Sequence, residues 1–157
     1  MDIFYEQFVT KDYKAEQKKF NSCRQALGIL IIFNIILNLG ILTIFFVACY
    51  FVLVIVARKK FLEFEYELTG KDLVINKIIN KKSRKIIGNV NLDDVVEIVC
   101  EEKFCRKDVK IINASLGEIK NQKILVMKND SGLIGYRMSI DSKLQKIFKS
   151  INPTVFR

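Results

Sequence analysis

The chain has 157 residues, a formal net charge of +9, four cysteines and no histidine. This length accommodates at most one ordinary domain with appendages. Without histidine or closely paired cysteines we expect no metal site and no cofactor. No nucleophile elbow or glycine-rich phosphate loop is present, so we expect no enzyme and no catalytic residue. The basic residues are interspersed with acidic ones, which argues against nucleic-acid binding.

Residues 1–22 are predicted to form a juxtamembrane segment. MDIFYEQFV (1–9) places Phe4 and Phe8 four residues apart, with Ile3 and Tyr5 nearby. Three interpretations remain open for this stretch. It is a short amphipathic helix on the membrane surface, a segment packed against the rest of the protein, or a frayed tail.

An uncharged apolar run extends over residues 26–57. As one helix it would be about 48 Å long, at about 1.5 Å per residue, whereas a bilayer core is about 30 Å thick. A single helix would also place two asparagines and a glycine near the midplane, where polar groups are costly. We therefore expect a transmembrane hairpin over residues 23–60, with helices at about 23–37 and 41–57 and a turn at 38–40. A single tilted span is the alternative.

Two clusters of basic residues flank the apolar run: Lys18, Lys19 and Arg24 before it, and Arg58, Lys59 and Lys60 after it. Basic residues prefer the cytoplasmic side of a membrane. A hairpin keeps both clusters on that side, which predicts a multi-pass protein of the cell membrane with both termini in the cytoplasm. Arg58, Lys59 and Lys60 are predicted to anchor the second helix at the lipid headgroups.

Residues 61–157 are predicted to form a cytoplasmic β-domain. FLEFEYEL (61–68) alternates apolar and acidic residues, which is typical of a half-buried strand with its glutamates on the open face. Short turns that separate the strands predict an antiparallel meander, in which lysines of the next two strands face these glutamates. Six further strands are predicted at 73–79, 84–91, 93–100, 108–115, 123–129 and 133–140, with a tight DSG turn at 130–132.

The β-domain is predicted to end with a helix at 141–152. Its apolar residues are spaced for one helical face: Leu144, Ile147, Phe148 and Ile151. Asp141 or Ser142 is a suitable N-cap, and Asn152-Pro153 ends the helix because the residue before proline disfavours helical angles. Seven strands closed by one helix predict a small, partly open antiparallel β-barrel or sandwich.

FEYELTGKDLVINKIINKKSRKIIGNVNLDDVVEI (64–98) resembles the opening of bacterial pleckstrin-homology-like (PH-like) domains, including an L-x-x-V segment at Leu92–Val95. The whole chain resembles a family of small bacterial membrane proteins with no established activity. The shared features are an MD-x-FYEQ start, an apolar hairpin, an EFEYE strand (63–67), an INKII strand (75–79) and a late Asn152-Pro153 pair. This resemblance implies an α+β membrane protein whose transmembrane hairpin precedes a PH-like domain.

The resemblance also implies a candidate lipid site, because PH domains that bind phosphoinositides use basic residues around their first strand connections. The corresponding residues are Lys77, Lys81, Lys82, Arg84 and Lys85. The alternative is a solvated hairpin tip. Asp93 and Asp94 are a candidate carboxylate pair, although adjacent acids after a strand are more typical of a loop.

These observations predict a non-catalytic, membrane-tethered binding or scaffolding module. Its partners would be the lipid bilayer and a membrane or cytoplasmic protein that pairs with an exposed strand edge. Two alternatives remain open: a sensor of anionic lipid headgroups that uses the basic turn, and a small accessory subunit of a transport or envelope complex.

Overall fold

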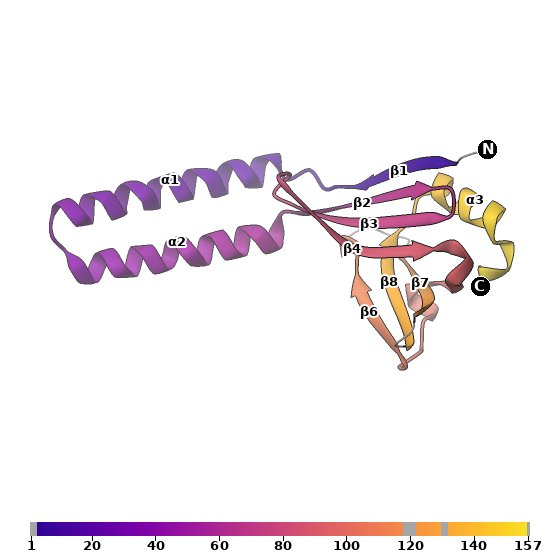
Figure 1. The fold of residues 1–157 in the computed structure, drawn as a ribbon. Coiled ribbons are helices and arrows are strands. Elements are labelled where there is room, and N and C mark those ends of the chain that lie inside the picture. Colours follow the sequence, from indigo (N-terminus) through magenta and orange to yellow (C-terminus); the bar gives the residue numbers. More distant parts are fainter. Residues whose placement is uncertain (1–2, 118–121, 130–131, 157) are drawn as a thin grey trace. The chain divides into compact units, whose positions relative to one another are not determined.

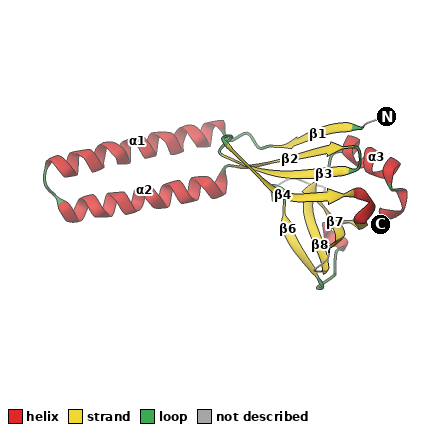
Figure 2. Cartoon of the chain, in the orientation of Figure 1, coloured by secondary structure: helices red, strands yellow, loops and turns green. Residues whose placement is uncertain are grey.

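The structure is a computed structural model that describes residues 3–117, 122–129 and 132–156. Met1 and Asp2 of the predicted start, and Asp130 and Ser131 of the predicted DSG turn, lie outside these residues. Figures 1 and 2 show the helices and strands of the described part. In chain order they are β1 (Phe4–Val9), α1 (Lys14–Ile36), α2 (Gly40–Lys60), β2 (Leu62–Thr69), β3 (Asp72–Ile79), β4 (Ser83–Asn91), β5 (Val95–Cys100), β6 (Val109–Asn113), β7 (Gln122–Asn129), β8 (Gly132–Ser139) and α3 (Ser142–Ile151). Short 3-10 helices lie at η1 (Leu92–Asp94), η2 (Glu101–Lys103) and η3 (Pro153–Val155).

The chain divides into two compact units. The sheet unit comprises Met1–Thr10 and Glu63–Arg157, and the helical unit comprises Lys11–Leu62. The helical unit is therefore inserted in the chain between the first and second strands of the sheet unit. The sequence predicts a separate N-terminal segment over residues 1–22, whereas β1 belongs to the sheet unit.

In the helical unit, α1 and α2 are antiparallel and lie side by side (Figure 2). They are joined by a turn at residues 37–39, in which Asn38 has a φ of 58°, a left-handed angle that asparagine tolerates. The backbone N–H groups of residues 37, 38 and 39 all donate to carbonyls of the last turn of α1, at 3.0–3.1 Å. α1 begins at Lys14, well before the predicted start at residue 23, and α2 continues to Lys60.

Among the described residues, α2 is the one helix that is long and apolar enough to cross a membrane. The first half of α1, from Lys14 to Gln25, is polar, and only its second half is apolar. The sequence predicts two membrane-spanning helices. By length and composition, only the second of the two, α2, is suited to span a membrane. The reason is that the polar residues before Ala26 belong to α1 itself and not to a separate segment.

The sheet unit contains two four-stranded sheets, in the orders β1-β2-β3-β4 and β5-β7-β8-β6. β2, β3 and β4 form the predicted meander. β1 pairs antiparallel with β2, from Phe4 opposite Thr69 to Val9 opposite Phe64. The two sheets do not close into a barrel, so the prediction of a barrel is wrong. The prediction of purely antiparallel pairing is also wrong, because β6 and β8 are parallel.

The two sheets pack closely against each other at Gly88 and Tyr66. A Cβ atom at Gly88 of β4 would lie 2.6 Å from the ring of Tyr136 in β8, so any side chain there would require this ring to shift. Tyr66 of β2 is fully buried, and its hydroxyl donates to the carbonyl of Ala114 at 2.6 Å and accepts from the N–H of Ser139 at 3.1 Å. These hydrogen bonds satisfy the one polar group of the buried ring, and burial raises the pKa of Tyr66.

α3 forms as predicted. The Asp141 carboxylate accepts a hydrogen bond from the N–H of Leu144 at 2.7 Å, which caps the helix,. Leu144 and Phe148 are buried on its apolar face. The helix ends at Ile151, immediately before Asn152-Pro153.

Candidate functional site

The basic turn joins β3 to β4 through two residues with left-handed backbone angles. Asn80 has a φ of 51° and Lys81 a φ of 58°, and the N–H of Lys82 donates to the carbonyl of Ile79 at 3.1 Å. Two successive positive φ angles are typical of the tight turns that match strand twist. For a lysine this angle costs about 1–2 kcal/mol, so the turn holds Lys81 in a conformation that its own side chain disfavours.

Strand register distributes the predicted lipid contacts over both faces of the first sheet. Lys77 of β3 pairs with Lys85 of β4, so these two side chains share one face,. Arg84 pairs with Ile78 on the other face. Lys82, Arg84 and Lys85 are exposed, whereas Lys77 is half-buried. The five predicted residues therefore lie near one turn but do not form one continuous surface.

Two of these cations face buried glutamates of β2. Lys81 Nζ lies 3.9 Å from Glu63 Oε1, and Arg84 Nη2 lies 3.4 Å from Glu65 Oε1. Glu63 is 7% exposed and Glu65 is 1% exposed. The sequence places these glutamates on an open face, and this prediction is wrong because neighbouring strands and long cationic side chains cover them. The sequence predicts that lysines of the next two strands face these glutamates, whereas the observed cations are Lys81 of the turn and Arg84 of β4.

The buried carboxyl group of Glu65 lies close to several polar and charged side chains. Its Oε2 accepts from Asn76 Nδ2 at 3.3 Å, while Oε1 has no hydrogen-bond donor among the described residues despite the nearby Arg84. Burial and a hydrogen bond with Glu6 of β1 raise the pKa of Glu65, and the charge of Arg84 opposes this rise. Glu6 is also directly opposite Glu67. The outer face of the first sheet thus concentrates carboxyl groups that repel one another when ionised.

The opposite face of β1 connects the N-terminus to the start of α3. Tyr5 donates to Asp141 Oδ2 at 2.6 Å. Gln7 donates from Nε2 to the carbonyl of Ser139 at 2.7 Å and accepts at Oε1 from the N–H of Asp141 at 3.1 Å. The Gln7 amide therefore bonds the chain at residues 139–141 as a neighbouring strand would. The FYEQ stretch was open to three interpretations, and the second, packing against the rest of the protein, is the one observed.

This network also shifts the titration of Tyr5. The hydrogen bond to Asp141, partial burial and the negative charge of Asp141 raise the pKa of Tyr5 to about 12. Lys143 lies over the Tyr5 ring at 4.7 Å from its centroid, a distance suited to a cation–π contact. Alternation supplies the signal for this strand: Tyr5, Gln7 and Val9 face inward, while Phe4, Glu6 and Phe8 are exposed.

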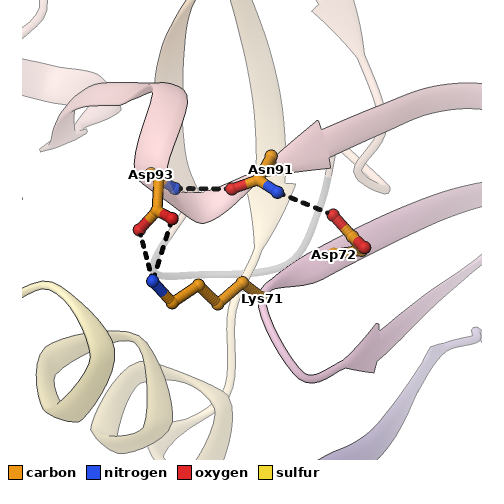
Figure 3. A network of polar contacts seen from close by, with 4 residues as sticks. All are labelled: Lys71, Asp72, Asn91 and Asp93. Atoms are coloured by element: carbon orange, nitrogen blue, oxygen red, sulfur yellow. Dashed lines mark hydrogen bonds and ion pairs between the residues drawn. The ribbon is translucent and has the colours of Figure 1, made fainter.

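The candidate pair Asp93 and Asp94 lies in η1, where Asp93 has a structural partner (Figure 3). Lys71 Nζ lies 2.9 Å and 3.0 Å from the two carboxylate oxygens of Asp93. Asn91 caps η1 by accepting from the N–H of Asp93 at 2.9 Å, and its Nδ2 donates to Asp72 Oδ1 at 2.9 Å. Figure 3 shows these four side chains linking the start of β3 to the end of β4. Asp93 therefore has a structural role, because its ion pair with Lys71 links η1 to the residue that precedes β3.

In the helical unit, the predicted anchors Arg58, Lys59 and Lys60 form the last turn of α2 and are exposed. Cations in this position interact favourably with the helix dipole. Lys60 Nζ also lies 2.8 Å from Glu16 Oε2 of α1. All four cysteines are free, and the described residues contain no group of three potential metal ligands.

Comparison with known families identifies the family of the chain. One family model matches residues 1–157, and its description is "Bacterial PH-like domain (DUF6106)". The chain belongs to this family. No curated protein and no solved structure matches this sequence.

Membership assigns this bacterial PH-like chain an α+β fold and supports the predicted PH-like domain. PH-like domains are generally non-catalytic and suggest a binding module. The family description names no activity, ligand or partner. A more specific function must therefore be inferred from the geometry of the chain itself.

Proposed function

We propose that this chain is a membrane-tethered, non-catalytic binding module. The helical unit inserts into the lipid bilayer. The sheet unit, to which we assign the PH-like fold and which we call the PH-like unit, presents a surface to a protein partner. The carrying observation is the exposure of large apolar side chains in the helical unit, from Ile29 (68%) through Ile41 (87%) to Phe51 (61%). Soluble monomers rarely expose apolar patches of this extent. In a bilayer, lipid tails would cover these side chains and remove them from water.

The pairing of β1 with β2 supports placing both ends of the helical unit on one side of the membrane. The chain leaves the first sheet after Val9 and returns to it before Phe64, and these two residues are directly paired. A chain that crossed the membrane once between them would separate the two strands of that pair. This pairing supports a helical unit that enters and leaves the bilayer through the same membrane surface.

The distribution of charge supports the cytoplasm as that side. Lys18, Lys19 and Arg24 lie in the first half of α1, and Arg58–Lys60 end α2. No charged residue lies between Ala26 and Ala57. Basic residues near helix ends are retained in the cytoplasm, and an anionic membrane surface attracts each with about 1 kcal/mol.

A test of tethering uses the full chain expressed in bacteria. Membranes are washed with alkaline carbonate, which releases peripheral proteins, and then treated with detergent. We expect the chain to resist carbonate and to be released by detergent. Recovery of the chain in the soluble fraction before any wash would exclude the proposal.

The partner surface that we propose is the free edge of β4. β4 ends the first sheet, so one side of its backbone lacks a neighbouring strand within that sheet. Exposed Ile86 (65%) lies on this strand, and such edges accept an extended peptide by strand addition. A photo-crosslinking residue at Ile86 is expected to capture a partner in cells, and the same residue at exposed Glu102 serves as the control. Equal yields at the two positions would exclude this edge.

A second candidate function is recognition of anionic headgroups by the basic turn. Lys82 and Lys85 are exposed and have no ion pair among the described residues. Glycerophosphate titrated into the detergent-solubilised full chain tests this function. Saturable, salt-sensitive binding that Lys82→Glu with Lys85→Glu abolishes would favour it, and an unchanged signal in the variant would exclude it.

A further inference from the structure

An ion pair near the open end of the helical unit indicates which residues of the two helices lie side by side. Lys60 Nζ lies 2.8 Å from Glu16 Oε2, and Lys60 also lies over the ring of Phe20. Counting eight residues from Glu16 and from Lys60 toward the turn places Arg24 level with Val52. The depth of any residue of α1 can therefore be compared with the residue of α2 beside it.

This register exposes a mismatch in apolar length. The apolar part of α2, Gly40–Ala57, extends about 27 Å at about 1.5 Å per residue, close to the roughly 30 Å of a bilayer core. The apolar part of α1, Ala26–Ile36, extends only about 16 Å. Asn21, Arg24 and Gln25 are exposed, and they lie beside the apolar end of α2. A pair of complete spans would bury these groups in hydrocarbon.

The turn between the helices has the composition of a membrane interior. Ile36, Leu37, Leu39 and Ile41 are 74%, 51%, 41% and 87% exposed around the single polar residue Asn38. The backbone N–H groups of residues 37–39 are all bonded within the chain, so the turn does not need water for these donors. Asn34 is buried, and its amide donates to the carbonyl of Leu30 at 2.7 Å.

We infer that the helix pair enters the bilayer from one surface and ends inside it, so that the turn at Leu37–Leu39 never reaches the opposite surface. This inference rests on the proposed membrane tether and specifies how the chain contacts lipid. Arg24 lies at the headgroups of the entry surface, where its long side chain can extend toward water. Residues of α2 beyond Val52 lie in the headgroup layer alongside the polar half of α1.

Two general considerations favour partial insertion over a complete crossing. Tilting the pair shortens its reach along the membrane normal and cannot lengthen the apolar part of α1. Thinning the bilayer to match α1 would have to remove about 14 Å, at fractions of a kcal/mol for each Å. Partial insertion avoids that deformation and leaves every exposed apolar side chain of the turn in hydrocarbon.

The test is site-specific labelling of the full chain in bacterial membranes. All four native cysteines are replaced by alanine, and single cysteines are introduced as Leu39→Cys at the turn and Lys82→Cys in the PH-like unit. Leu39 has a φ of −89°, so cysteine fits its backbone. Right-side-out and inside-out vesicles are treated with a membrane-impermeant maleimide. We expect Lys82→Cys to react in inside-out vesicles, and Leu39→Cys to react in neither until detergent is added.

Other outcomes separate this inference from the tether itself. Reaction of Leu39→Cys only in right-side-out vesicles would overturn partial insertion and leave the tether standing. Reaction of Leu39→Cys in inside-out vesicles, together with release by carbonate, would overturn both.

A second variant tests the cause of partial insertion. Combined replacement of Asn21, Ser22, Arg24 and Gln25 by leucine leaves Asn34, whose amide is bonded to the carbonyl of Leu30, as the one polar side chain in residues 20–36 of the cysteine-free α1, a segment about 25 Å long. We expect Leu39→Cys in this background to react at the opposite surface. Continued protection would show that the length of α1 does not set the depth of the turn.

Discussion

The helical unit and the PH-like unit differ in which side chains they bury and which they expose. In the PH-like unit, a carboxyl group at Glu65 is 1% exposed, whereas in the helical unit an isoleucine at position 41 is 87% exposed. The buried carboxyl group has its own compensation within the chain, from the amide of Asn76 and the charge of Arg84. The exposed isoleucine has none. The comparison teaches that the PH-like unit compensates its buried charge within the chain, whereas the helical unit leaves its large apolar side chains exposed, as the proposed tether requires.

The largest effect is expected when an arginine replaces an exposed isoleucine in the helical unit, compared with the same replacement at a similarly exposed position in the PH-like unit. Ile44→Arg places a cation on α2 at a site that is 72% exposed. If lipid surrounds that site, the cost is about 2.5–3.5 kcal/mol, and the carbonate-resistant fraction should fall sharply. Ile86→Arg, at 65% exposure in the PH-like unit, is the control and should leave that fraction unchanged. Equal behaviour of the two variants would remove the distinction between the regions.

The packing of the two sheets is probed by adding one methyl group. Gly88→Ala would place a Cβ 2.6 Å from the Tyr136 ring, whereas Gly117→Ala meets nothing within 4 Å. Overpacking of this kind costs about 1–3 kcal/mol. We expect thermal unfolding in detergent to shift downward by several degrees for Gly88→Ala alone. An unchanged unfolding temperature for Gly88→Ala would mean that the sheets are not in close contact at this point.

A smaller effect is expected from the bond between β1 and the cap of α3. Tyr5→Phe removes the hydrogen bond to Asp141 and should cost about 1 kcal/mol at neutral pH. Because folding raises the pKa of Tyr5 to about 12, from about 10 in the unfolded chain, the folded state binds the proton more tightly. The wild-type chain should therefore lose stability as the pH rises from 10 to 12, and the variant should lose less. A double-mutant cycle with Asp141→Asn measures the coupling.

The smallest effect concerns the repelling carboxyl groups of the outer face. Folding raises the pKa of Glu65, so this group favours the folded state at low pH. That contribution is lost as the pH rises from the ordinary glutamate range through the raised pKa. Glu6→Gln removes one of the repelling charges and should stabilise the chain at pH 7 by less than about 1 kcal/mol, with a flatter pH profile. Glu102→Gln, in exposed η2, is the control. A loss of stability in Glu6→Gln would contradict this account.

The elements of the PH-like unit could be predicted where the signal is local. β2, β3, β4 and α3 follow from alternation, turn residues and the Asn152-Pro153 stop, and the structure places them within a few residues of the predicted ranges. The strand β1 was missed as a strand because its partner lies beyond the whole helical unit. Parallel pairing of β6 with β8 and the separation of the two sheets likewise depend on contacts that no local pattern encodes.

The candidate site was predictable in composition but not in arrangement. The basic residues of the turn are visible in the sequence, yet the register that places Lys85 and Arg84 on opposite faces is not. The burial of Glu65 contradicts its polarity and follows from neighbours on β1, β3 and β4. The network of Tyr5 and Gln7 with residues 139–141 joins the two ends of the chain, which a scan along the sequence cannot relate.

The direct pairing of Val9 with Phe64 has a practical consequence for protein engineering. A fragment that starts at residue 61 discards an edge strand and bares the side of β2 that β1 covers. The opposite strategy is to excise residues 11–62 and connect the two cut ends by a short Asn-Gly hairpin loop, which suits antiparallel neighbours. Such a miniaturised chain would carry all eight strands and α3 on one uninterrupted polypeptide that lacks the apolar helices.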